Sequence, residues 1–116
     1  MRQIKTIAIV GASSRGRRIA YAALVAGYRT VLEDVSLSVL EQGIASVLRA
    51  LGEEVAHGTI PSAVRDAALA NLTASISAED ASREADLIIE AVADEEEMKL
   101  ELFTIFDKFE IGRAHV

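Results

Sequence analysis

The chain has 116 residues, 51% of them hydrophobic and 26% charged, with a formal net charge of -6, which predicts one small folded domain. The acidic charge argues against a nucleic-acid-binding surface, and no apolar stretch is long enough to span a bilayer, so no membrane partner is expected. The chain has no cysteine, and Arg2 and Lys5 lead straight into a short strand instead of a secretory signal; the expected location is the cytoplasm.

The first predicted element is a strand that runs into a glycine turn. Residues 7–10 form an unbroken apolar run, typical of a strand buried on both faces of a parallel sheet. The next six residues match the dinucleotide-binding fingerprint G-x-G-x-x-G except at Ser13, which replaces the middle glycine. Ser13 would either crowd a phosphate or hydrogen-bond to it. A helix N-terminus after such a turn predicts an anion site for a dinucleotide pyrophosphate. The candidate cofactor-binding residues of this turn are Gly11, Ala12, Ser13, Ser14, Arg15 and Gly16.

The second predicted strand ends in an acid. A helix over residues 16–26, rich in small side chains, is followed by the strand at 29–34. Asp34 lies 18 positions after Gly16, close to where an acid accepts hydrogen bonds from an adenosine ribose. The alternative is a helix-cap or loop carboxylate; the glycine turn upstream favours the ribose. A carboxylate here would repel a 2′-phosphate, so NAD is expected rather than NADP.

Two predicted helices separate the second strand from the third. Ser36 or Ser38 caps a long helix that ends at Gly58, and Ser38 with Glu41 has capping-box spacing. A further helix runs from Pro61 to about residue 71. This helical hairpin is an insertion relative to a minimal βαβ unit, and it is either a packing appendage or a flap that contacts substrate.

The rest of the chain alternates again between strands and helices. Residues 72–76 form a short strand, and Ser77 with Asp80 caps about one helical turn. Residues 87–92 form a fourth apolar strand. A last helix begins near Asp94, with Met98, Leu102, Ile105, Phe106 and Phe109 as its buried stripe.

Four segments, in this order, resemble the N-terminal NAD-binding domain of the 3-hydroxyacyl-CoA dehydrogenases. They are Ile-Ala-Ile-Val-Gly-Ala at 7–12, Gly-Tyr-Arg-Thr-Val-Leu-Glu-Asp at 27–34, Ala-Asp-Leu-Ile-Ile-Glu-Ala-Val at 85–92 and Lys-Leu-Glu-Leu-Phe at 99–103. The hairpin between the second and third strands is characteristic of that family. The resemblance covers residues 1 to about 109 and implies an α/β fold: an incomplete Rossmann-type, doubly wound parallel sheet of about four strands in the order 3-2-1-4.

The resemblance also implies a function. Such enzymes oxidise the 3-hydroxyl of an L-3-hydroxyacyl-CoA and pass the hydride to NAD, as in fatty-acid β-oxidation. The glycine loop then holds the pyrophosphate and Asp34 the ribose. Asp94 takes the place of the family's second acid after the fourth strand, and Lys99 that of a lysine near the cofactor.

Several features of the family are changed or missing. A serine and a lysine that contact coenzyme A in the family's hairpin are replaced by Ala50 and His57. The Asn-Thr-Ser-Ser and His-Phe-Phe-x-Pro motifs would lie beyond Phe109. His57 and His115 match no catalytic histidine, so no catalytic residue and no metal ligand is assigned, and the 116-residue chain by itself is expected to be inactive. Residues 110–116 match nothing in the family and are interpreted as a foreign tail.

Two other functions remain open: a non-enzymatic nucleotide-binding or self-associating module, and a related NAD-dependent 3-hydroxy-acid dehydrogenase. The arginines at 15, 17 and 18 either pair with the pyrophosphate or are solvated. Without further strands, residues 87–92 would form an unpaired apolar edge beside the last helix, which predicts a homodimer.

Overall fold

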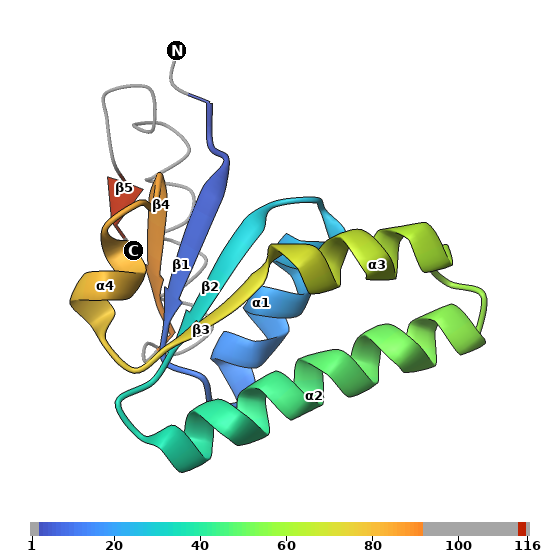
Figure 1. Ribbon diagram of the computed structural model, residues 1–116, viewed down its shortest axis with the longest axis horizontal. Coiled ribbons are helices and arrows are strands. Elements are labelled where there is room, and N and C mark those ends of the chain that lie inside the picture. The colour runs from blue at the N-terminus through green and yellow to red at the C-terminus, as the bar shows by residue number, and fades with distance from the viewer. Residues whose placement is uncertain (1–2, 92–113, 116) are drawn as a thin grey trace.

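The computed structural model describes residues 3–91 and 114–115 of the chain. They form one parallel sheet with four helices (Figure 1). The strands are β1 (Thr6–Val10), β2 (Arg29–Glu33), β3 (Leu72–Ser75), β4 (Leu87–Glu90) and β5 (Ala114–His115). The helices are α1 (Ser14–Val25), α2 (Leu37–Ala56), α3 (Ser62–Asn71) and α4 (Ala78–Ser82).

The sheet has the order β3-β2-β1-β4-β5, and every neighbouring pair is parallel. Strand β1 lies in the middle, with Ile9 opposite Leu32 of β2 and Ile89 of β4. Along the chain, β2 and β3 are therefore added on one side of β1, and β4 is then added on its other side. This reversal is the switch point at which doubly wound sheets bind nucleotides. The predicted Rossmann-type fold and the order 3-2-1-4 are confirmed.

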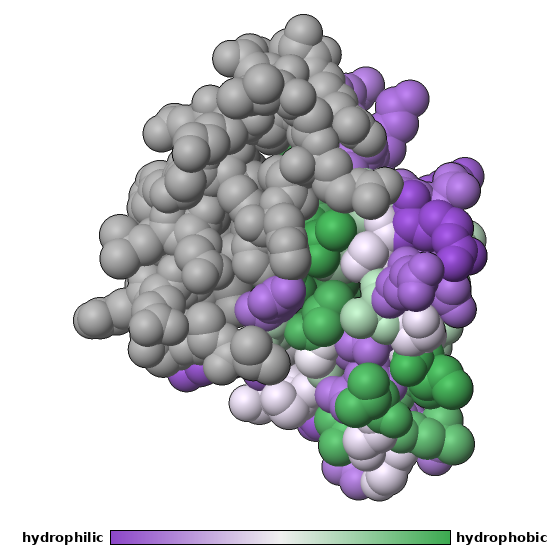
Figure 2. All heavy atoms as spheres, turned by 90° about the vertical axis from the view of Figure 1, so that its left-hand side faces the viewer, coloured by the Kyte–Doolittle hydropathy of each residue, from purple (hydrophilic) through white to green (hydrophobic). Residues whose placement is uncertain are grey.

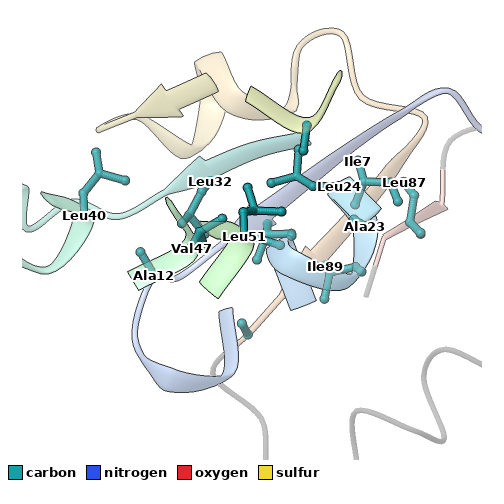
Figure 3. Packing of buried hydrophobic residues seen from close by; sticks show 14 residues of the cluster. Ile7, Ala12, Ala23, Leu24, Leu32, Leu40, Val47, Leu51, Leu87 and Ile89 are labelled. Atoms are coloured by element: carbon teal, nitrogen blue, oxygen red, sulfur yellow. The ribbon is translucent and has the colours of Figure 1, made fainter. Parts of the chain in front are cut away.

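The helices cover both faces of the sheet. On one face, α1, α2 and α3 pack over Ile7, Ile9 and Leu32, and Figure 3 shows the α2 side chains Val47 and Leu51 among them. On the other face, Ala81 of α4 packs with Ala8 and Ile88. Because both faces are covered, β1 reads as an unbroken apolar run, and Ala8 and Ile9 are completely buried. Burying a side chain such as Ile9 contributes about 1.5–3 kcal/mol.

One predicted feature of the sheet is wrong. Strand β4 is not an unpaired edge, because Leu87 and Ile88 pair with Ala114 and His115 of β5. These two residues fall in the tail that was interpreted as foreign to the fold. A two-residue parallel strand has no sequence pattern of its own, which is why the sequence did not reveal it. The structural premise of the predicted homodimer is thereby weakened.

Element boundaries differ slightly from those predicted. Helix α1 begins at Ser14, two residues early, and the cap of α2 is Ser36, whose hydroxyl accepts the Val39 N–H at 3.3 Å. Ser77 caps α4 as predicted, through the Asp80 N–H at 3.2 Å. The predicted helix from Asp94 to about 109 lies outside the described residues. Among the helices that are described, none is long and apolar enough to cross a membrane.

Candidate cofactor-binding site

The turn after β1 requires glycine at its first position. Gly11 has a φ of 108°, a left-handed value that side chains rarely adopt. Its N–H donates to the carbonyl of Glu33 at 2.8 Å, and the N–H of Ala91 donates to the carbonyl of Val10 at 2.8 Å. The ends of β2, β1 and β4 are thus joined by backbone hydrogen bonds where the chain leaves the sheet.

The last glycine of the turn sets how closely α1 approaches it. A Cβ added to Gly16 would lie 1.7 Å from the carbonyl oxygen of Gly11. No side chain fits there, because the obstacle is backbone rather than the flexible end of a side chain. Gly16 therefore lets the first turn of α1 lie directly against the end of β1.

Ser13 takes the place of the middle glycine without backbone strain. It is the N-cap of α1, exposed, with φ -77° and ψ -165°, an extended conformation open to any residue. Its hydroxyl makes no capping hydrogen bond, whereas the serines that cap α2 and α4 do. The N-terminal N–H groups of α1 have no acceptor within the helix, and this cap supplies none. That end of α1 can hold an anion such as a pyrophosphate.

Asp34, the acid that follows β2, is hydrogen-bonded to the glycine turn. The Asp34 carboxylate accepts the N–H of Ala12 at 3.0 Å through Oδ2 and the N–H of Ser36 at 2.9 Å through Oδ1. Asp34 therefore acts as a loop carboxylate, which was the alternative interpretation of this residue. These two hydrogen bonds use only two of the roughly four acceptor positions of a carboxylate. The half-buried Asp34 can still accept hydrogen bonds from ribose hydroxyls.

Helix α2 and Arg17 support the turn from the side. A Cβ at Gly43 of α2 would meet the Ala12 carbonyl oxygen at 2.7 Å, so α2 lies against Ala12, which is completely buried. The Arg17 Nε donates to the same carbonyl at 3.4 Å. The hairpin thus has a packing role at the cofactor turn. Sequence reasoning missed Gly43, and a glycine inside a helix was the available signal.

A groove of about 410 Å³ lies between α1 and α2. Arg17, Arg18 and Tyr21 line one side of it and Ala50 lines the other. Arg18 is exposed, and its Nε donates to the carbonyl of Ser14 at 3.3 Å. Burial raises the pKa of the Tyr21 hydroxyl, and the charge of Glu54 raises it further. The lining of the groove is mainly apolar, and two cationic residues, Arg17 and Arg18, border it on the α1 side.

Sequence reasoning also missed a buried acid beside the turn. The Glu33 side chain is 2% exposed, and its Oε2 has no hydrogen-bond partner. Burial raises the pKa of this carboxyl most, and the neighbouring charge of Asp34 raises it further, while the N–H of Gly11 lowers it. A glutamate at the end of an apolar strand was the signal in the sequence.

Apolar surface adjoins Asp34. Val35 and Ile76, which follow the ends of β2 and β3, are 83% and 62% exposed, and Leu37 at the start of α2 is 59% exposed. Figure 2 looks onto the side where these loops lie and shows apolar surface near its lower end. A flat apolar ring held by its ribose at Asp34 would find such surface within reach.

The remaining residues singled out from the sequence contribute little here. Arg15 is half-buried in the first turn of α1. His57 is the exposed C-cap residue of α2. Asp94 and Lys99 lie outside the described residues. Within the described ranges, no three His, Cys, Asp or Glu side chains gather into a group that could hold a metal ion.

The chain is similar to known proteins along nearly its whole length. Residues 6–112 match the sequence profile of a family described as 3-hydroxyacyl-CoA dehydrogenase, NAD binding domain. A 3-hydroxybutyryl-CoA dehydrogenase from Bradyrhizobium diazoefficiens is 32% identical over 100 residues, which are 86% of this chain. A peroxisomal fatty acid β-oxidation multifunctional protein from Arabidopsis thaliana is 31% identical over 93% of this chain.

The fold is shared with solved structures. The crystal structure of (S)-3-hydroxybutyryl-CoA dehydrogenase from Ralstonia eutropha has a TM-score of 0.71 and 30% identity, over 92% of this chain and 38% of that one. The chain spans 34% of the Bradyrhizobium relative and 15% of the Arabidopsis one. The profile match ends at residue 112, three residues beyond the predicted boundary.

Proposed function

The chain belongs to the 3-hydroxyacyl-CoA dehydrogenase family, as an NAD-binding domain, and we propose that it supplies the dinucleotide-binding part of an enzyme that oxidises an L-3-hydroxyacyl-CoA. The observation that carries this proposal is the joint geometry of the turn and the acid. The Asp34 carboxylate accepts the Ala12 N–H at 3.0 Å. The neighbouring N-terminus of α1 receives no side-chain hydrogen bond from its N-cap residue, Ser13. The ribose of a dinucleotide would then bind Asp34, and its pyrophosphate would bind the neighbouring N-terminus of α1.

The residues suit NAD in particular. The N-terminal turn of α1 would hold the pyrophosphate, Asp34 the adenosine ribose, and Val35 and Ile76 the adenine. When bound, NAD supplies the acceptor for the hydride of the substrate. Asp34 is expected to disfavour NADP, because a 2′-phosphate would place negative charge against its carboxylate.

The acyl-CoA substrate is a proposal for the longer protein, because this chain spans 34% of the length of the Bradyrhizobium relative. The names of that relative and of the multifunctional proteins support it. The groove between α1 and α2 also supports it, because Arg17 and Arg18 place positive charge beside Ala50, at the start of the region where a coenzyme A phosphate would be held. Replacing Arg18 with alanine should weaken binding of coenzyme A, most clearly at low salt. The control is Arg29→Ala, which removes an exposed arginine at the N-terminal end of β2.

Isothermal titration of the 116-residue chain with NAD, NADP and ADP tests the cofactor assignment. We expect NAD and ADP to bind, and NADP to bind at least about tenfold more weakly than NAD, a difference of roughly 1.4 kcal/mol. The absence of any binding by NAD or ADP would contradict the proposal. Equal binding of NAD and NADP would contradict the assigned role of Asp34 alone.

A homodimer and a cytoplasmic location are also proposals. For the dimer, the support is that β5, the outer strand of the described sheet beside β4, is two residues long, and the outer strand of a sheet can pair with a second chain. Light scattering over a dilution series is the test, and a monomer at high micromolar concentration would contradict the dimer. For the location, the support is composition alone, and fractionation of cells that express the longer protein would test it.

A further inference from the structure

Glu33 carries an acceptor that nothing in the fold uses. Its side chain is 2% exposed, and Oε2 has no hydrogen-bond partner. A buried polar group in this state destabilises a protein, because it loses its hydration without gaining a partner. The side chain points to the same face as Val31, two residues earlier in β2, which packs against apolar residues. An apolar side chain would therefore suit the position better if packing were its only purpose.

The carboxyl group of Glu33 lies next to the cofactor site. Glu33 is the last residue of β2, opposite Val10 and Ser75 in the neighbouring strands. Its backbone carbonyl accepts the N–H of Gly11 at 2.8 Å. Burial raises the pKa of its carboxyl group most, the charge of Asp34 raises it further, and the N–H of Gly11 lowers it. An unsatisfied buried acid between these two residues calls for an explanation beyond packing.

We propose that Glu33 is a second acid of the adenosine site, and that its carboxylate accepts a hydrogen bond from a ribose hydroxyl of the bound nucleotide. The inference rests on the proposed function, because it assumes that the ribose lies at Asp34. Each oxygen of Asp34 already accepts one backbone N–H, so a second carboxylate adds acceptors for the two ribose hydroxyls to the two positions that Asp34 has left. The contact requires the buried carboxyl group to turn toward the end of β2, where Asp34 follows it in the chain.

The proposed contact and the charge of Glu33 have opposite effects on nucleotide affinity. A carboxylate repels the phosphates of a nucleotide, so removing it should strengthen binding unless it makes a favourable contact. The variant Glu33→Leu removes the acceptor and also the buried unsatisfied oxygen. It should therefore fold more stably and yet bind the nucleotide more weakly. A residue with a purely structural role would not produce this combination.

Titration calorimetry with ADP, 2′-deoxyADP, 3′-deoxyADP and inosine diphosphate tests the proposal on the wild-type chain, Glu33→Leu and Glu33→Gln. The control is Glu84→Gln, which removes an exposed carboxylate just before β4, at the opposite edge of the sheet. We expect Glu33→Leu to weaken ADP binding about tenfold and to raise Tm by about 4 °C or more. The wild-type chain should bind one of the two deoxy nucleotides about tenfold more weakly than ADP, and Glu33→Leu should lose that difference.

Each other outcome overturns the inference. If Glu33→Leu binds ADP as tightly as the wild-type chain, or more tightly, Glu33 makes no favourable contact. If Glu33→Leu removes discrimination against inosine diphosphate instead, the carboxylate contacts the base and not the ribose. If the wild-type chain binds ADP and Glu33→Leu does not, but Glu33→Leu has a lower Tm, the side chain is structural. If the wild-type chain binds no ADP, the proposed function fails together with the inference.

Discussion

The carboxylate of Asp34 accepts the backbone N–H of Ala12 at 3.0 Å. The two residues are 22 positions apart, and the bond joins the loop after β2 to the turn after β1. The carboxylate that we propose binds the ribose and the turn that we propose binds the pyrophosphate are therefore held at one spacing in the chain without nucleotide. This preorganisation reduces the conformational freedom lost on binding.

Replacing Asp34 with alanine should abolish the preference for NAD over NADP. We expect affinity for NAD to fall by about tenfold or more, because an acceptor for the ribose is lost together with the bond that positions Ala12. Affinity for NADP should fall much less. Titration with both dinucleotides measures the ratio, and an unchanged ratio would show that Asp34 does not select the cofactor.

Replacing Gly16 with alanine should unfold or strongly destabilise the chain. The added Cβ would lie 1.7 Å from the Gly11 carbonyl oxygen, and relieving that overlap would move α1 away from β1 at a cost of about 3 kcal/mol or more. The matched control is Gly52→Ala in α2, where nothing lies within 4 Å. That substitution should stabilise the chain by about 0.5–1 kcal/mol. Urea denaturation of the two variants distinguishes them, and similar midpoints would contradict the close approach at Gly16.

The serines at the starts of α1 and α2 should respond differently to alanine. Ser36→Ala removes the hydroxyl that accepts the Val39 N–H and should lower the free energy of unfolding by about 1 kcal/mol. Ser13→Ala removes a hydroxyl that makes no capping bond, so stability should change by less than about 0.5 kcal/mol. Equal losses in thermal unfolding would mean that Ser13 caps α1 in solution.

Stability should depend on pH through Glu33. Burial and the charge of Asp34 raise the pKa of the Glu33 carboxyl in the folded chain above its ordinary value of 4.5. The contribution of this group to stability is therefore fully present below pH 4.5 and is lost as the pH rises through the raised pKa. Glu33→Gln, which has no such titration, should gain stability relative to the wild-type chain between pH 4 and pH 7. The measurement is Tm at both pH values, with the exposed Glu84→Gln as control. A gain that is the same at both pH values would contradict the assignment.

The sequence by itself determined the fold class and the first half of the site. The apolar run of β1, the glycines at 11 and 16 and the acid at the end of β2 carry local signals, because burial on both faces, a left-handed φ and a strand end each restrict the residues allowed. The order of the strands followed from the family resemblance, and the structure has it.

Only the tertiary structure decided which distant parts of the chain meet. The bond from Ala12 to Asp34, the contact of Gly43 with the glycine turn and the pairing of β4 with β5 join residues that are far apart in the chain. The lack of a hydrogen-bond partner for the buried Oε2 of Glu33 also depends on the tertiary structure. Nothing in an apolar strand that ends in two acids says which one accepts backbone N–H groups and which is buried without a partner, because that depends on the neighbours that packing brings to each side chain.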